Sequence, residues 1–268
     1  MNKKIYVAGG DLRLYHAYQS ILKKGYDVIY EKEPSEKNTA EADILLFGVP
    51  VTRDNKTLFL PQSDKKVYLS DITKAIDKNK LLIAGKIPKG IFGCKTEDLL
   101  LRDDFAILNA VPTAEGVLEI AMRETDFCLS GANCLITGYG RIGKVLSDRF
   151  NAVGACVTVT ARRDSDLALS SALGFKAIQT ADVINHIKDF DIIINTVPYL
   201  IFTEEVLKNA SKDTLLIDTA SSPGGVDFKA AKSLGVKTIH ALSLPGKVAP
   251  KTAGEIISDL ALKIINGF

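Results

Sequence analysis

The sequence lacks an excess of charge of either sign, and it lacks any apolar run long enough to cross a membrane. Its 268 residues include 34 Lys and Arg against 32 Asp and Glu, which gives a formal net charge of +2. No overall field therefore attracts nucleic acid or an anionic lipid surface. Nothing approaches the roughly 20 apolar residues that span a bilayer, and the apolar stretch near Met1 is too short for a signal peptide. We expect a globular cytoplasmic protein with no nucleic-acid or membrane partner.

Cysteine is also scarce, and its spacing gives no sign of a metal site or a disulfide framework. The four cysteines are Cys94, Cys128, Cys134 and Cys156, with no C-x-x-C pair, and three of them sit in or beside apolar runs. Such scattered positions favour buried free thiols over a disulfide or a zinc site. We expect no bound metal.

What the sequence does contain is a complete G-x-G-x-x-G loop at residues 138–143. An apolar run at 134–137 precedes it, and apolar residues at steps of three and four follow it, so the order is strand, glycine turn, helix. This context predicts a dinucleotide-binding loop whose phosphates face the start of the helix. The alternative is a glycine-rich turn that binds nothing. The loop residues expected to contact a cofactor are Gly138, Tyr139, Gly140, Arg141, Ile142 and Gly143.

The strand after this helix indicates which dinucleotide is bound. In an NAD site an acidic residue about 20 positions after the first glycine accepts hydrogen bonds from the ribose. Here no Asp or Glu occurs between Asp148 and Asp164, and Arg162 and Arg163 stand at the end of the strand instead. Guanidinium groups suit a 2′-phosphate, so the sequence favours NADP over NAD. A solvated strand end is the alternative. The cofactor contacts expected here are Thr160, Ala161, Arg162 and Arg163.

Polar loops of small residues follow three later strands, where ligands of parallel sheets bind. Together they are expected to surround a nicotinamide ring. The cofactor contacts expected from them are Thr196, Val197, Pro198, Thr219 and Ala220. His240 ends the last of these strands, but a lone histidine there is more often structural than catalytic.

The first 120 residues predict a second α/β domain. A strand at 4–8, the glycines of residues 9–10 and a helix at 12–24 resemble half of a nucleotide fold but lack the third glycine. We expect further strands at 26–30, 44–49, 67–69, 81–84 and 105–108, a short helix at 72–78 and a mobile surface excursion at 53–66.

The two domains are expected to be joined by helices. Residues 112–116 mark a break, after which Thr113 caps a helix at 113–129, and a final apolar helix begins at Pro250. The predicted class is α/β, with a flavodoxin-like or degenerate Rossmann domain at 1–120 that the helix at 251–268 completes. A doubly wound NADP-binding Rossmann domain, with enough strands for a six-stranded sheet, is expected at 121–250.

Several longer strings carry a resemblance to a known family. They are A-V-P-T-A-E-G at 110–116, A-S-S-P-G-G-V-D-F at 220–228, L-P-G-K-V-A-P-K-T-A-G at 244–254 and V-A-G-G-D at 7–11. With the loop at 138–143 they make the chain similar to the A subunit of dipicolinate synthase over about residues 105–260. The resemblance implies an NADP-dependent dehydrogenase that oxidises dihydrodipicolinate to dipicolinate during sporulation. It also implies a location in the mother cell and, for a partner, the flavoprotein-like B subunit of dipicolinate synthase, and it leaves a homo-oligomer open.

The resemblance also implies where a small dicarboxylate substrate binds. Cations are expected there, because the substrate is a dianion, and Arg13 is one candidate. The family pattern carries Arg where this chain has Ser222, so a lysine has to substitute for it. No general base stands out, and the side chains considered for a catalytic role are Ser221, His240 and Lys251. The substrate contacts expected are Thr113, Glu115, Ser221, Ser222, Pro223, Lys247, Lys251 and Thr252.

Two other functions remain open. A D-2-hydroxy-acid dehydrogenase shares the two-domain plan, but it places an Arg after the strand at 215–218 and a His with a Glu partner near the end of the chain, and this sequence has neither. A non-catalytic NADP-binding sensor or assembly protein would account for the absence of an identifiable base.

Overall fold

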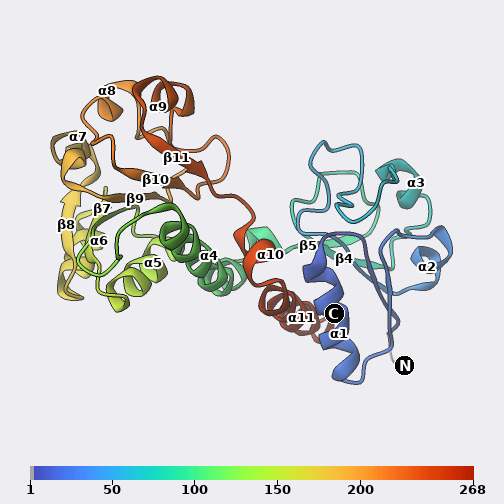
Figure 1. Cartoon of the computed structure of the whole chain (residues 1–268). Helices are drawn as coiled ribbons and strands as arrows, with labels where there is room; N and C mark the ends of the chain where they lie inside the picture. The colour runs from blue at the N-terminus through green and yellow to red at the C-terminus, as the bar shows by residue number, and fades with distance from the viewer. Residues whose placement is uncertain (1–2) are drawn as a thin grey trace. The chain divides into compact units, whose positions relative to one another are not determined.

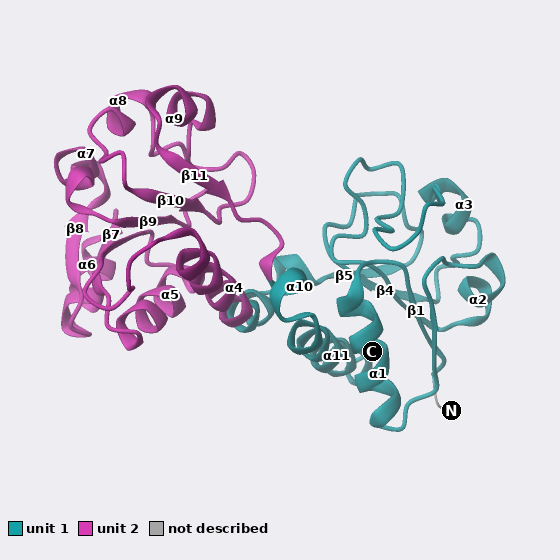
Figure 2. Ribbon diagram, viewed as in Figure 1, with its two compact units in different colours: residues 1–109, 245–268 teal, residues 110–244 magenta. Residues whose placement is uncertain are grey.

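The computed structural model describes residues 3–268 (Figure 1). The chain divides into two compact units, which Figure 2 colours separately. Unit 1 contains residues 1–109 and 245–268, and unit 2 contains residues 110–244. The division falls earlier in the chain than the boundaries expected at 120/121 and 250/251.

Unit 1 is built on a five-stranded parallel sheet with the order β2-β1-β3-β4-β5, which is the flavodoxin-like order. Its strands are β1 (Ile5–Ala8), β2 (Val28–Glu31), β3 (Ile44–Leu46), β4 (Leu81–Ala84) and β5 (Lys95–Asp98). Its helices are α1 (Leu12–Lys23), α2 (Glu36–Glu41), α3 (Leu69–Thr73), the 3-10 turn η1 (Leu99–Leu101), α10 (Leu244–Val248, which begins at the boundary) and α11 (Pro250–Asn266). The flavodoxin-like prediction for this half of the chain is confirmed.

The last helix of the chain, α11, completes unit 1 by packing against α1. A Cβ on Gly254 would lie 2.5 Å from the carbonyl oxygen of Arg13 and 2.6 Å from the Cβ of His16, so only glycine allows this approach. Ile257 and Ala261 on the same helix are fully buried in the core of the unit. A segment far from the N-terminus in sequence therefore covers one face of the β1 sheet.

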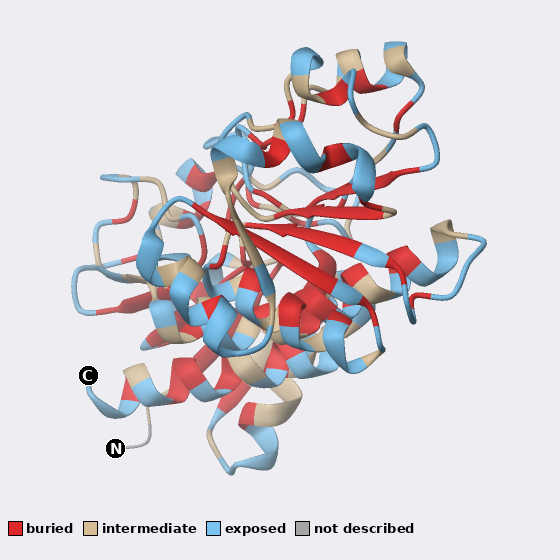
Figure 3. Cartoon of the chain, turned by 90° about the vertical axis from the view of Figure 1, so that its left-hand side faces the viewer, coloured by how far each residue is buried: buried red, intermediate tan, exposed pale blue. Residues whose placement is uncertain are grey.

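Unit 2 is a six-stranded parallel sheet with the order β11-β10-β9-β6-β7-β8, a doubly wound Rossmann arrangement. Its strands are β6 (Asn133–Thr137), β7 (Cys156–Ala161), β8 (Lys176–Gln179), β9 (Ile192–Asn195), β10 (Leu215–Asp218) and β11 (Lys237–His240). Its helical segments after α4 (Asp103–Glu124) are α5 (Arg141–Ala152), α6 (Asp164–Ala172), η2 (Thr180–Asp182), α7 (Val183–His186), η3 (Ile187–Asp189), α8 (Glu204–Leu207) and α9 (Phe228–Leu234). Buried strands lie beneath helices with exposed outer surfaces (Figure 3). The predicted six-stranded sheet is confirmed.

Helix α4 (Asp103–Glu124) corrects three predictions at once. Residues 105–108 belong to this helix and not to a strand, and Pro112 lies inside it, so Thr113 is no N-cap. A run of four apolar residues fits a buried strand and a buried helix equally well, and tertiary packing decided between them. Pro112 costs the helix one backbone hydrogen bond without ending it.

The same helix is long and apolar enough to span a membrane by composition, but half of its most apolar stretch is buried. Phe105 packs in a core of unit 1, and Ala114, Val117 and Ala121 pack in a core of unit 2. Phe105, Ala114, Val117 and Ala121 of α4 are therefore core residues, whereas Ile107, Leu108 and Met122 of the same helix are exposed.

Three further expectations about unit 1 need correction. Residues 67–69 form no strand, because α3 begins at Leu69. Strand β5 was missed because it is a polar sheet edge, K-T-E-D, without an apolar pattern. The excursion at 53–66 is organised: the Asp54 carboxylate accepts from the backbone N–H of Lys56 at 2.9 Å and of Thr57 at 2.8 Å, which holds the pKa of Asp54 well below its usual value.

The cysteines are free, as expected, but only Cys134 is fully buried. Burial raises the pKa of the Cys134 thiol. Cys128 lies within the loop between α4 and β6, and Cys156 is the first residue of β7; both are exposed.

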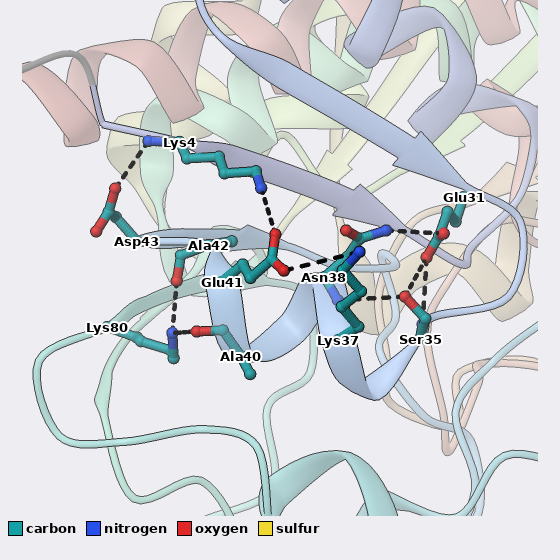
Figure 4. Close-up of polar contacts among 10 residues, drawn as sticks. All are labelled: Lys4, Glu31, Ser35, Lys37, Asn38, Ala40, Glu41, Ala42, Asp43 and Lys80. Atoms are coloured by element: carbon teal, nitrogen blue, oxygen red, sulfur yellow. Dashed lines mark hydrogen bonds and ion pairs between the residues drawn. The ribbon is translucent and has the colours of Figure 1, made fainter.

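Lys80 ties α2 to the loop that precedes β4 (Figure 4). Its ammonium group donates to the carbonyl oxygens of Ala40 and Ala42, each at 2.6 Å, and only 7% of its side chain is exposed. These carbonyls belong to the C-terminal end of α2, which has no basic residue of its own in its last turn. A buried cation therefore satisfies the end of a short helix.

We predict that Lys80→Met lowers the free energy of unfolding by about 2 kcal/mol, because the apolar stem is kept while two charge-assisted hydrogen bonds are lost. Lys78→Met is the matched control, since Lys78 is exposed. Denaturant titration compares the two variants. Equal stability of both would show that the Lys80 contacts contribute nothing.

Candidate functional site

The glycine loop between β6 and α5 has the geometry that a phosphate needs. Gly138 has φ +89°, a left-handed conformation that favours glycine, and its N–H donates to the carbonyl of Thr160 at 2.9 Å. A Cβ on Gly143 would lie 1.9 Å from the carbonyl oxygen of Gly138, whereas a Cβ on Gly140 would meet nothing within 4 Å. Gly143 therefore lets α5 approach the turn, and Gly140 leaves open space in front of it.

Helix α5 begins directly behind this open space. Gly140 is its N-cap residue and makes no side-chain capping bond. The first N–H groups of a helix have no partner within the helix and form the positive end of its dipole. The helix is 12 residues long, so this end suits an anionic group such as a pyrophosphate.

A cavity of about 820 Å³ adjoins the loop within unit 2. Its walls combine the glycine turn and the end of β7 with apolar side chains from the segments after β8 and β9. The lining residues are Gly138, Tyr139, Ala161, Arg162, Arg163, Asp166, Thr180, Ala181, Val183, Ile184, Val197, Tyr199, Ile201 and Val206. A cavity of this size, with few polar groups and an apolar wall, fits the adenosine half of a dinucleotide.

Some of these lining residues, such as Gly138 and Arg162, are predicted by the sequence motifs, and others are not. Thr180, Val183 and Tyr199 are examples of those missed: they come from segments with no motif, which the folding of the sheet brings beside the glycine loop. Tyr199 is 70% exposed, which is a property of the folded chain, and no sequence motif marks it.

The two arginines at the end of β7 are not equivalent. Arg162 is exposed and has no ion-pair partner within residues 3–268. The guanidinium of Arg163 forms a two-pronged ion pair with Asp166, from Nε to Oδ2 at 2.8 Å and from Nη2 to Oδ1 at 3.1 Å. This pairing raises the pKa of Arg163. Both arginines line the cavity, and of the two only Arg163 has an ion-pair partner among residues 3–268.

A buried polar network joins the ends of three adjacent strands in unit 2. The Asn195 amide donates to Asp218 Oδ1 at 2.8 Å, and Thr137 Oγ1 donates to Asn195 Oδ1 at 2.6 Å. The two oxygens of Asp218 also accept from the backbone N–H of Ala220 at 3.0 Å and of Gly225 at 3.1 Å. All three polar side chains are fully buried, so the network holds the 219–225 loop in one shape.

Several predicted cofactor contacts serve this framework in the structure. Thr196 Oγ1 donates to the carbonyl of Thr137 at 2.8 Å, and Thr219 Oγ1 donates to the carbonyl of Asn195 at 2.8 Å. Thr160 is buried and accepts from Thr180 at 3.3 Å. These hydroxyls hold the ends of the strands, while Val197 lines the cavity itself.

The catalytic candidates of unit 2 lack the partners that a general base needs. Ser221, Ser222 and Pro223 are exposed at the tip of the loop that Asp218 holds. His240 is exposed at the end of β11 and packs on the ring of Phe228, with centroids 5.0 Å apart. No acidic side chain pairs with His240 in the part of the chain that the structure describes. Its position supports a structural role.

The other predicted substrate residues lie elsewhere in the chain. Lys247, Lys251 and Thr252 belong to unit 1, and Lys251 lines a small hollow of about 180 Å³ beside α1. Thr113 is buried within α4. Glu115 lines a separate hollow on α4, away from the glycine loop.

Arg13 is buried in unit 1 and already paired. Its guanidinium donates to both oxygens of Asp11, at 2.8 Å each, and to the carbonyl of Val49. A Cβ on Gly246 would lie 3.0 Å from Arg13 Nε and 3.1 Å from Asp11 Oδ2, so the L-P-G-K segment also depends on this pair. The charge of Arg13 is therefore neutralised by Asp11.

The glycine turn of unit 1 holds protein in place of a phosphate. The N–H of Gly10 donates to the carbonyl of Phe59 at 3.1 Å, and a Cβ on Gly9 would lie 2.6 Å from the side chain of Leu60. Residues of the 53–66 excursion thus cover the turn after β1. The expectation that unit 1 has no dinucleotide of its own stays a prediction.

We predict that Gly143→Ala mainly lowers stability, whereas Gly140→Ala mainly weakens dinucleotide binding. Gly143→Ala should lower the free energy of unfolding by about 3 kcal/mol, because its methyl group would overlap the Gly138 carbonyl. Gly140→Ala should change it by no more than about 1 kcal/mol, yet weaken dinucleotide binding at least about tenfold, because the methyl group occupies the space that a pyrophosphate needs. Thermal unfolding and calorimetric titration measure the two effects. Unchanged binding by Gly140→Ala would show that phosphates do not approach this loop.

The comparisons with known proteins agree with this geometry. Residues 109–248 match the family described as S-adenosyl-L-homocysteine hydrolase, NAD binding domain, and this stretch contains all of unit 2. Residues 4–97 match the N-terminal domain of the dipicolinate synthase A subunit. Unit 2 is therefore a Rossmann domain of the kind that binds a nicotinamide dinucleotide.

Three relatives extend the match to the whole chain. The A subunit of dipicolinate synthase from Bacillus subtilis is 42% identical over 171 residues, which span 64% of this chain and 58% of that protein. The crystal structure of the A chain from Bacillus subtilis is 30% identical, with a TM-score of 0.90 over 100% of this chain and 97% of that one. The structure from Bacillus halodurans is 29% identical, with a TM-score of 0.91 over 99% and 98%. The chain therefore belongs to the family of dipicolinate synthase A subunits.

Proposed function

We propose that this chain is the NADP-dependent oxidoreductase subunit of a dipicolinate synthase and oxidises dihydrodipicolinate to dipicolinate during sporulation. The observation that carries the proposal is the glycine-loop cavity with an unpaired arginine, Arg162, in a chain of this family. The family name supplies the product, and the cavity supports a dinucleotide as the oxidant. On this proposal the protein acts in the cytoplasm of the mother cell.

Three parts of unit 2 would contact three parts of the dinucleotide. The start of α5 behind Gly140 would face the pyrophosphate, and Arg162 at the end of β7 would face a 2′-phosphate. The 219–225 loop, held by Asp218, would lie at the nicotinamide end, since ligands in such sheets lie outside the carboxyl ends of the strands.

The proposed reaction needs little acid–base catalysis from the protein side chains. A bound nicotinamide dinucleotide would accept one hydride from the dihydropyridine ring, and one proton leaves to water or a base as the ring becomes aromatic. Aromatisation drives the reaction, so positioning contributes more than acid–base catalysis. This account agrees with the exposed, unpaired environment of His240.

The substrate is a dianion, and the lysines of the L-P-G-K-V-A-P-K-T segment are its proposed contacts. Lys247 and Lys251 have no ion-pair partner among the described residues, whereas Arg13 is paired with Asp11. Ser222 would contribute a hydroxyl where the family pattern has an arginine. The flavoprotein-like B subunit of the synthase is the proposed partner.

A non-catalytic NADP-binding sensor or assembly protein is the second candidate. The observation that favours it is the absence, across residues 3–268, of an acidic partner for His240 or of any paired base at the 219–225 loop. The same observation weighs against a D-2-hydroxy-acid dehydrogenase, because that reaction needs a histidine with a carboxylate beside it.

We predict that the chain, mixed with its partner, dihydrodipicolinate and NADP+, produces reduced cofactor and dipicolinate in equal amounts. Absorbance of the reduced cofactor follows the reaction, and omission of the dicarboxylate is the control. If NADP+ binds but reduced cofactor never forms, with or without the partner, the sensor function is correct and the dehydrogenase is not.

We predict that Arg162→Ala weakens NADP+ binding by about tenfold, because a guanidinium bonded to a phosphate is a strong, charge-assisted contact, and leaves NAD+ binding nearly unchanged. Arg149→Ala is the matched control, since Arg149 pairs with Asp148 on α5 and does not line the cavity. Titration calorimetry gives both dissociation constants. An equal loss for both dinucleotides would contradict a role in reading the 2′-phosphate.

A further inference from the structure

Asp166 places a carboxylate in the same wall of the cavity as the two arginines. It lies in the first turn of α6, three residues after Arg163, and only 16% of its side chain is exposed, against 76% for Arg163. Both of its oxygens are engaged by the Arg163 guanidinium. The carboxylate is therefore the buried member of the pair, and the arginine is the exposed one.

The negative charge of Asp166 affects Tyr139 in the glycine loop. Its negative charge contributes to raising the pKa of Tyr139, after the larger effect of burial, and Tyr139 and Asp166 both line the cavity. An anion bound beside Arg162 would meet this carboxylate as well as the arginines. Like charges in a partly buried site repel more strongly than they do in water.

The ion pair also removes one arginine from the site. The N–H groups of the Arg163 guanidinium that donate to the Asp166 carboxylate are the same kind of donors that would bind a phosphate. They cannot form both sets of hydrogen bonds at once. If Arg163 turned to a phosphate, Asp166 would be left unpaired next to that phosphate. Arg162 is thus the one cation at the end of β7 without a competing carboxylate in the described chain.

We propose that Asp166 is a specificity-determining residue that opposes a 2′-phosphate by repelling it and by sequestering Arg163. The preference for NADP over NAD then depends on the attraction of Arg162 for the 2′-phosphate minus the repulsion from Asp166. It is therefore weaker than the preference expected from two arginines that are both available to the phosphate. This inference rests on the proposed function of the cavity as a dinucleotide site.

Asp166→Asn tests the proposal, because the amide keeps the size of the side chain and removes its charge. The expected result is NADP+ binding stronger by about fivefold at low ionic strength, with NAD+ binding changed less than about twofold, and a gain that shrinks in high salt. Asp164→Asn is the matched control: Asp164 is also in the first turn of α6, accepts from Gln179 and does not line the cavity.

A double-mutant cycle separates repulsion from sequestration. In the Asp166→Asn background, where the arginine is released, Arg163→Gln should cost NADP+ affinity, and no cost there would contradict sequestration. In the wild-type background Arg163→Gln leaves Asp166 without its partner, so the cost measured there reports the repulsion. Titration calorimetry measures all four proteins, and thermal unfolding verifies that each is folded.

The outcomes distinguish this inference from the proposed function. If the wild type binds NADP+ and Asp166→Asn binds it equally or more weakly, the inference is wrong and the dinucleotide site stands. If the wild type binds neither NADP+ nor NAD+, the proposed function and the inference both fail. An equal gain from Asp164→Asn would show a general charge effect and would also overturn the role of Asp166.

Discussion

The close approach of Gly143 to the carbonyl of Gly138 is the contact on which the site of unit 2 depends. No other residue type fits, because a Cβ would lie 1.9 Å from that oxygen. The contact brings the start of α5 against the end of β6, so the unpaired N–H groups of the helix face the open space in front of Gly140. The position of the helix end against the turn is thus the consequence of one steric constraint.

A second constraint acts at the other strand ends. Asp218 is a fully buried carboxylate whose oxygens accept from the Asn195 amide and from two backbone N–H groups of the following loop. Removing such an acceptor would leave buried donors unsatisfied, which costs more than the bonds themselves contribute. The loop that carries Ser221 and Ser222 is therefore rigid at its base and exposed at its tip.

Fewer basic side chains are available to a ligand than the sequence motifs imply. Arg13 and Arg163 are each held by an aspartate close in sequence, Asp11 and Asp166. Arg162 is left as the cation of the cavity wall without such a partner among the described residues. A count of basic residues in the motifs overestimates the number available to a ligand, because Arg13 and Arg163 are each engaged by an aspartate two or three residues away.

Local sequence was sufficient for the Rossmann unit and its glycine loop. The strands at 192–195, 215–218 and 237–240 and the helix after Gly140 follow from apolar periodicity and glycine placement, which depend on near neighbours. Unit 1 was harder to predict. The polar edge strand β5 has no apolar pattern, and the residues around Pro112 carry break signals that the packing of α4 overrides.

The sequence by itself determined the fold class, the phosphate-facing loop and the resemblance to a family, because these reside in continuous strings of residues. Tertiary structure alone decided which side chains line the cavity. Tyr199 and Val183 reach the glycine loop only when β9 and β8 take their places beside β6 and β7 in the sheet. It also decided that Arg162 is unpaired while Arg163 is not, since the partner of an arginine depends on where a helix begins and how its first turn is oriented.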